Sequence, residues 1–194
     1  MTVDFGAPAT VVKSPSKLAH VVLRTNNIRA MIEFYKSFLG ARLVHDAGHL
    51  AFLTYDDEHH RIAFAEVPGT QAKLATSCGL EHIAFSFDSL SDLLLAYSQR
   101  KQKGILPIWS LNHGPTTSIY YRDPDGNQIE TQVDNFENAD DATAFMSSKE
   151  FEENPIGTDF DPEDLIARLS KGESELSLKK RVEIGPRGIP EHML

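Results

Sequence analysis

A faint internal repeat constrains the fold of this chain more than any other feature. Residues 17–23 read KLAHVVL and residues 79–85 read GLEHIAF, so a histidine opens a run of strand-forming residues in each copy. The two histidines, His20 and His82, stand 62 positions apart. Since a repeat marks one structural unit used twice, the sequence predicts two copies of the same supersecondary motif.

Each copy continues with a helix pattern. In the first copy, apolar residues recur at helical spacing over residues 28–38, after Asn26 or Asn27 as the N-cap and before Gly40 as the stop. The second copy repeats the pattern over residues 90–97. Short strand-like segments follow each helix, at about residues 42–45, 49–55 and 61–67 in the first copy and 105–111, 116–122 and 128–133 in the second.

These elements predict an α+β protein in which two βαβββ modules form one incomplete barrel-like domain. A module of this size buries too little apolar surface to be stable alone, so the two should pack together. We expect an N-terminal lead over residues 1–16 and the paired domain over residues 17–134, with modules at about 17–68 and 79–134.

The distribution of charge predicts a separate C-terminal extension over residues 135–194. The whole chain has 28 acidic and 19 basic residues, a net charge of −9, but residues 134–175 alone contain 13 acidic and 3 basic ones. Within this segment, Asp161 and Pro162 predict the start of a short helix that ends near Gly172. The glycine- and proline-rich residues beyond it predict an extended arm.

Composition also limits the partners. The acidic balance and the lack of a basic stripe disfavour nucleic acid, and no apolar run is long enough to span a membrane. A single cysteine, Cys78, cannot form an internal disulfide, so we expect a cytoplasmic protein in which any metal is bound by histidines and carboxylates. A homodimer is possible for paired modules with a long arm.

The last hairpin predicts which side chains share a face. If the turn at residues 123–127 is symmetric, Tyr120 lies opposite Glu130 on the neighbouring strand. The same reasoning in the first module pairs Leu53 with Ala63, which would then stand where the second module has Glu130.

The repeat relates His20 to His82 and Ala63 to Glu130. We therefore expect His20, His82 and Glu130 to face one shared cavity, in which the fourth equivalent position, Ala63, offers no ligand. Two imidazoles and one carboxylate with open positions are suited to non-haem Fe(II). Taken singly, a residue of this kind is more often structural or solvent-exposed than a metal ligand. The matching places of these residues in the repeat strengthen the case that all three bind the same metal.

These residues give the chain a resemblance to the vicinal oxygen chelate superfamily over residues 17–134, and within it to the small type I extradiol dioxygenases. The ring-cleavage pattern of that family is matched at His113, Ile119, Tyr120, Asp123, Pro124, Gly126 and Glu130, and it is missed at Leu111. The resemblance implies that His20, His82 and Glu130 hold Fe(II), and that His113 and Tyr120 assist catalysis. The expected reaction is cleavage of a catechol-like aromatic diol by O2 beside its two hydroxyls.

Larger members of that family carry a further active-site histidine between the modules, and residues 61–81 contain none. His59 or His60, at the tip of the first module's hairpin, could substitute; otherwise either His113 alone moves protons or the reaction differs. Two other functions stay open: a different metal enzyme of the superfamily, such as a glyoxalase-like isomerase or an epimerase, and a metal-free small-molecule binding protein. The vacant corner at Ala63 counts against a site with four protein ligands.

Overall fold

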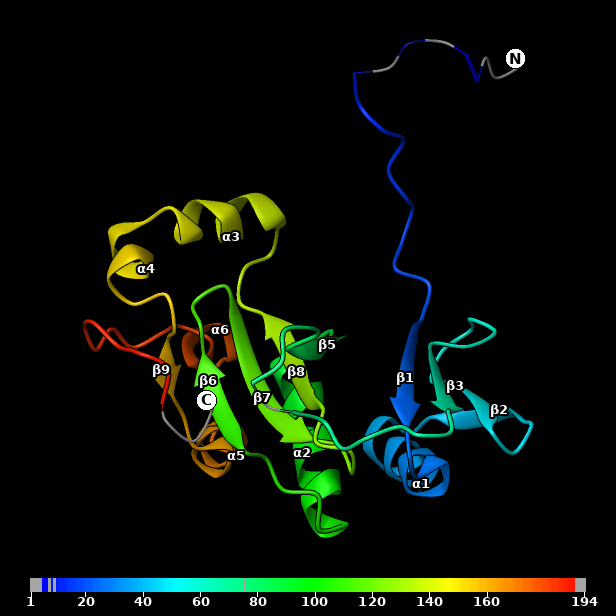
Figure 1. Ribbon diagram of the computed structural model, residues 1–194. Coiled ribbons are helices and arrows are strands. Elements are labelled where there is room, and N and C mark those ends of the chain that lie inside the picture. Colours follow the sequence, from blue (N-terminus) through cyan, green and yellow to red (C-terminus); the bar gives the residue numbers. More distant parts are fainter. Residues whose placement is uncertain (1–4, 7, 9, 75, 191–194) are drawn as a thin grey trace.

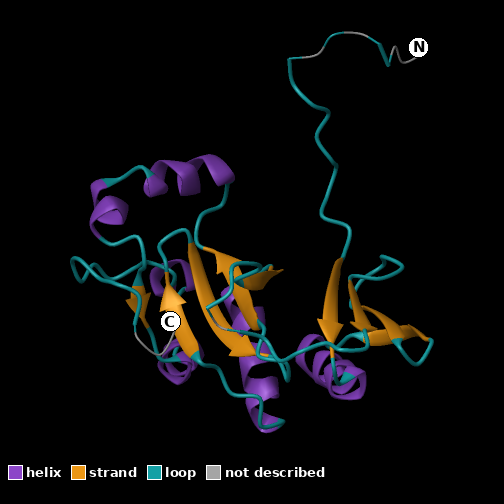
Figure 2. Ribbon diagram, viewed as in Figure 1, coloured by secondary structure: helices purple, strands orange, loops and turns teal. Residues whose placement is uncertain are grey.

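The computed structural model describes residues 5–6, 8, 10–74 and 76–190. Parts of the expected N-terminal lead and the last four residues of the expected extension lie outside these ranges. The described chain confirms the α+β class, with two open sheets and helices α1 and α2 on the same side of them (Figure 2). The described strands do not close into a barrel.

The two modules have the predicted order of elements (Figure 1). The first module consists of β1 (Val21–Thr25), α1 (Ile28–Leu39), β2 (Arg42–Asp46), β3 (Leu50–Thr54) and β4 (Ile62–Glu66). The second consists of β5 (His82–Phe87), α2 (Leu90–Gln102), β6 (Trp109–Asn112), β7 (Thr116–Arg122) and β8 (Gln128–Asp134). Strand β6 begins four residues later than the sequence predicts; Pro107, which precedes it, has no N–H to donate to a neighbouring strand.

Local signals place both helices. Asn27 caps α1 by accepting a hydrogen bond from the backbone of Ala30, and Gly40 follows the helix with φ of 65°. Ser89 caps α2 in the same way, accepting from the backbone of Asp92. The helix boundaries therefore follow from short-range polar contacts that the sequence encodes directly.

The two sheets have equivalent strand orders and equivalent pairing registers, as expected for a repeat. The strand orders are β1-β4-β3-β2 and β5-β8-β7-β6, and the first and last strands of each module pair in parallel. Val22 pairs with Ala63 in the first sheet, and Ala84 pairs with Glu130 in the second. Val22 and Ala84 are separated by the same 62 positions as the two histidines, so Ala63 is the structural counterpart of Glu130.

The hairpins test the predicted cross-strand pairs. Tyr120 lies opposite Glu130, as the sequence predicts. The predicted pair of Leu53 with Ala63 is wrong by one residue, because Leu53 pairs with Ile62 and Phe52 takes the place opposite Ala63. The loop between these strands is not symmetric, since the Asp56 carboxylate accepts hydrogen bonds from Thr54, Glu58 and Arg61.

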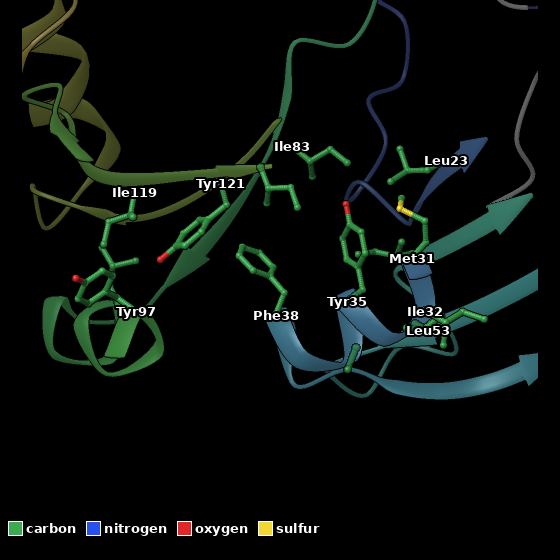
Figure 3. Packing of buried hydrophobic residues seen from close by; sticks show 14 of the residues in the cluster. Leu23, Met31, Ile32, Tyr35, Phe38, Leu53, Ile83, Tyr97, Ile119 and Tyr121 are labelled. Carbon is green, nitrogen blue, oxygen red and sulfur yellow. The ribbon is translucent and has the colours of Figure 1, made fainter. Parts of the chain in front are cut away.

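One hydrophobic core joins the two modules (Figure 3). Phe38, near the end of α1, packs edge-on against Tyr121 of β7 with ring centroids 4.9 Å apart. The buried guanidinium of Arg100 lies 4.0 Å from the centroid of the Phe38 ring and donates to the Phe38 carbonyl at 2.8 Å. Tyr35 adds a hydrogen bond to the buried carboxylate of Asp123 in the β7–β8 turn. Tyr121 is fully buried in this core, on the face of β7 opposite Tyr120.

The extension packs on the second module. It contains α3 (Ala139–Met146), α4 (Lys149–Glu153), β9 (Thr158–Asp159), α5 (Pro162–Ser170) and α6 (Glu175–Leu178). The predicted helix is α5, capped by Asp161, and Tyr97 of α2 donates a hydrogen bond to Glu163 on it. Strand β9 was not expected, and it adds a fifth strand to the second sheet beside β6. Residues 180–190 have no helix or strand, as the sequence predicts for an arm.

Within the described ranges, no helix has both the length and the apolar character needed to cross a bilayer.

The shared core predicts that the two modules unfold as one unit. Phe38→Ala removes a side chain that is 2% exposed, and such truncations cost about 3–5 kcal/mol. We expect the urea midpoint to fall equally when unfolding is followed by circular dichroism and by the fluorescence of Trp109, the single tryptophan, which lies in the second module. Phe5→Ala, at a side chain that is 97% exposed, is the matched control and should leave the midpoint unchanged. A tryptophan transition unmoved by Phe38→Ala would contradict a shared core.

Candidate active site

A cavity of about 760 Å³ opens over the second sheet, on the face turned away from the shared core. Strand alternation produces this face: His82 of β5 and Tyr120 of β7 point into the cavity, while their neighbours Ile83 and Tyr121 point into the core. His113, from the loop between β6 and β7, lines the same cavity. The volume lies within the range of about 300–1,000 Å³ that is usual for small-molecule sites.

His82 and Glu130 form the most tightly defined pair beside this cavity. The Nε2 atom of His82 lies 3.0 Å from Oε2 of Glu130. Glu130 is only 5% exposed, whereas the side chain of His82 is 36% exposed and reaches the cavity. The hydrogen bond to Glu130 raises the pKa of His82 despite its burial. Burial by itself would raise the pKa of Glu130, but hydrogen bonds from His82 and Ser118 outweigh it, so this pKa is lowered and the carboxylate stays ionised.

His113 and Tyr120 form a second pair beside the first. The Nε2 atom of His113 lies 2.8 Å from the hydroxyl of Tyr120, and the Tyr120 ring packs edge-on against His82 with centroids 5.7 Å apart. Burial lowers the pKa of His113, against the opposing effects of the Glu130 charge and of a hydrogen bond to the backbone of Ile156. Burial and the nearby Glu130 raise the pKa of Tyr120. At neutral pH the pair is thus a neutral imidazole beside a protonated phenol.

His20 is not brought into this group. It is exposed, it directly precedes β1 of the first sheet, and its ring lies 4.4 Å from that of His60. His59 in turn lies 4.4 Å from His60, so the three histidines gather at one end of the first sheet. Strands β1 and β5, which follow or contain the two repeat histidines, are both terminal strands of their sheets.

The donor atoms that converge at the cavity fit part of a metal site. An imidazole nitrogen and an ionised carboxylate oxygen, 3.0 Å apart, are donors that bind Fe(II) readily. Across the described ranges, however, no three histidine, cysteine, aspartate or glutamate side chains lie together closely enough to hold an ion. The second module therefore brings two of the three predicted ligands together, and His20 is not beside them.

The extension contributes to this site through residues that the sequence does not single out. Pro155, Ile156 and Ile189 line the cavity, and Arg181 donates a hydrogen bond to the backbone carbonyl of His113 at 3.0 Å. Nothing in the local pattern of residues 155–189 signals these contacts, because they join segments far apart in the chain. Trp109 of β6 lines the same cavity.

Comparison with known proteins relates this chain to a family that includes dioxygenases. The family described as the Glyoxalase/Bleomycin resistance protein/Dioxygenase superfamily matches residues 17–131. "Biphenyl-2,3-diol 1,2-dioxygenase 2" of Rhodococcus globerulus is 45% identical over 80% of this chain and 83% of its own. "Biphenyl-2,3-diol 1,2-dioxygenase 3" of the same organism is 42% identical over 85% of this chain and 88% of its own.

Among solved structures, the fold resembles that of a lactoylglutathione lyase from Agrobacterium tumefaciens, with a TM-score of 0.51 and 20% identity. The match covers 62% of this chain and 96% of that one. At this identity the likeness concerns the fold alone.

The pair of His82 with Glu130 predicts a charge-dependent titration. In the metal-free protein, Glu130→Gln removes the carboxylate that stabilises the His82 imidazolium, while the burial that opposes it remains. The pKa of His82 should therefore fall from above its ordinary value of about 6.5 to that value or below, as followed by NMR of the imidazole resonances. Glu33→Gln, at an exposed glutamate of α1, should leave the titration of His82 unchanged. An unaltered His82 titration in Glu130→Gln would show that the two side chains do not interact.

Proposed function

We propose that this chain, which belongs to the Glyoxalase/Bleomycin resistance protein/Dioxygenase superfamily, is an Fe(II)-dependent extradiol dioxygenase that opens the ring of an aromatic vicinal diol. The observation that carries the proposal is the pair of His82 and Glu130, 3.0 Å apart beside a cavity that also holds His113 and Tyr120. The 45% identity to a protein named as a biphenyl-2,3-diol dioxygenase supports the same chemistry.

The proposed iron ligands are His82, Glu130 and His20. The first two already converge, and His20 comes from the equivalent position of the other module. Bound Fe(II) would bring the diol and O2 together and stabilise the negative charge of the deprotonated diol. Both atoms of O2 enter the product. The carbon–carbon bond beside the diol breaks, so a single ring-opened molecule has an aldehyde or ketone at one end and a carboxylate at the other.

His113 is proposed to take a proton from the substrate. Its lowered pKa keeps the ring neutral, and its hydrogen bond to the backbone of Ile156 leaves the nitrogen that faces Tyr120 as an acceptor. When the Tyr120 hydroxyl turns from this nitrogen to a substrate oxygen, the neutral imidazole is free to accept a proton from a diol hydroxyl and to return it to the ring-opened product. The sequence offers no second histidine between the modules, and this arrangement needs none.

Tyr120 is proposed to orient oxygen atoms of the substrate. Its raised pKa keeps the phenol protonated, so the hydroxyl remains a hydrogen-bond donor throughout the reaction. It stands between His113 and His82, 2.8 Å from the ring nitrogen of the first and edge-on to the second. A donor fixed at this point favours one placement of the diol, which lowers the entropic cost of reaching the reactive geometry.

Ala63 separates this proposal from an isomerase or epimerase that uses four protein ligands. Its register in the first sheet matches that of Glu130 in the second, and alanine has no donor atom. A site built from this chain thus keeps the positions opposite the protein ligands open for the diol and O2.

Oxygen uptake tests the proposed activity. Protein loaded anaerobically with Fe(II) and mixed with 2,3-dihydroxybiphenyl or catechol should consume one O2 per diol and form a yellow ring-opened product that contains both oxygen atoms of 18O2. His82→Ala should abolish uptake, whereas Glu33→Gln, on the exposed side of α1, should not change it. Absence of uptake from iron-loaded protein across a panel of catechols would reject the proposal. Unchanged diol binding by His82→Ala, again without turnover, would favour a metal-free binding protein.

A further inference from the structure

We infer that the C-terminal arm, residues 180–190, is the wall of the cavity that selects the substituent carried by the diol, and that Arg187 holds this wall in place. The inference rests on the proposed function, which it deepens. The arm follows α6 and runs beside β9 at the edge of the second sheet (Figure 1). Near its end, Ile189 lines the cavity together with Trp109 and Ile156.

The start of the arm is fixed by Arg181. Its side chain is only 2% exposed, and its guanidinium donates to the backbone carbonyls of His113, Asn154 and Glu150 at 2.8–3.0 Å. It also forms two hydrogen bonds to Glu183 within the arm. These hydrogen bonds fix the start of the arm against the loop that carries His113.

The end of the arm is held by Arg187. One amino group of its guanidinium donates to the Asp159 carboxylate at 2.7 Å, and the other to the Gly157 carbonyl at 3.3 Å. Asp159 accepts a hydrogen bond from the Trp109 indole at 2.6 Å, and the guanidinium lies 5.7 Å from the centroid of the Trp109 ring. Arg187 thus joins the arm both to β9 and to an aromatic side chain that lines the cavity.

These contacts do more for the shape of the cavity than for the stability of the fold. An ion pair whose carboxylate is 58% exposed contributes little to stability. The Trp109 ring, however, lies 5.7 Å from the Tyr120 ring, so the position of the indole bears directly on the space next to the catalytic pair.

The chemistry of the cavity wall indicates which part of the substrate lies against the arm. Polar and charged side chains of the second module and the segment before it line one part of the cavity, among them His82, His113 and Tyr120. The lining residues from the extension, Pro155, Ile156 and Ile189, are all apolar. Ile189 is 53% exposed. A diol whose hydroxyls meet the sheet would direct its substituent toward these residues, where an apolar group gains from covering Ile189. The arm should therefore favour diols with an aromatic or branched aliphatic substituent over unsubstituted catechol.

Steady-state kinetics with two diols test the inference. Ile189→Ala and Arg187→Ala should each lower kcat/KM for 2,3-dihydroxybiphenyl about tenfold, mainly through KM, because a methylene group added to or removed from a hydrophobic pocket changes kcat/KM by roughly 10–200-fold. Catechol carries no substituent that reaches the arm, so its kcat/KM should fall much less, and the ratio of the two kcat/KM values should decrease several-fold in both variants. The matched control is Arg168→Ala, which breaks an arginine–glutamate pair of the same extension outside this cavity and should leave both substrates unchanged.

Equal decreases for both diols, or an unchanged ratio of the two kcat/KM values, would overturn the inference. A second readout does not need turnover: binding of each diol to the anaerobic protein, followed by quenching of Trp109 fluorescence. If wild-type protein opens neither diol, the proposed function fails. The role of the arm is then judged from the ratio of the Kd for catechol to the Kd for 2,3-dihydroxybiphenyl. This ratio should fall about tenfold in Ile189→Ala and stay constant in Arg168→Ala.

Discussion

The contact between helix α1 and the second module is the interaction on which the rest of the structure depends. Phe38 contacts both the Arg100 guanidinium and the Tyr121 ring, and Arg100 also donates to the carbonyl at this end of the helix. Strand β7 carries Tyr121 into this core and, one residue earlier, Tyr120 into the cavity. Because neighbouring residues of a strand point to opposite faces, packing of the core fixes the orientation of the candidate catalytic side chains. A shift of the core would displace Tyr120 as well.

The sequence was sufficient wherever the determining contacts are local or repeated. Asn27 and Ser89 cap the helices they precede, and the turn after Tyr121 sets Tyr120 opposite Glu130. That turn is determined by its own residues, since Asp123 accepts hydrogen bonds from the backbone of Asp125 and Asn127. The prediction for the first-module hairpin is one residue out of register because side-chain hydrogen bonds within its loop make the loop asymmetric. The equivalence of Ala63 with Glu130 survives this error, because the parallel pairing with the first strand of each module determines it.

The site could be predicted only in part. Periodicity places His82 and Glu130 on one face, and their pairing is consistent with it. The distance between the modules is a tertiary property that a repeat does not encode, which is why the place of His20 relative to Glu130 could not be read from the sequence. The contacts of Arg181 and Arg187 likewise join the extension to residues up to about 80 positions away, and no local signal marks an arginine that will bind a distant carbonyl. The extension thus lines part of the cavity, while the second module supplies the candidate reactive groups.

The central claim is that one iron is held by His82 and Glu130 with His20 from the other module. Anaerobic equilibrium dialysis against Fe(II), followed by metal analysis of the protein, tests this most directly. The account predicts one tightly bound Fe(II) per wild-type chain, strong loss of binding in His20→Ala, His82→Ala and Glu130→Ala, and wild-type binding in His49→Ala, at an exposed histidine of the first module. Full iron binding by His82→Ala or Glu130→Ala would contradict it, and full binding by His20→Ala alone would remove His20 from the ligand set.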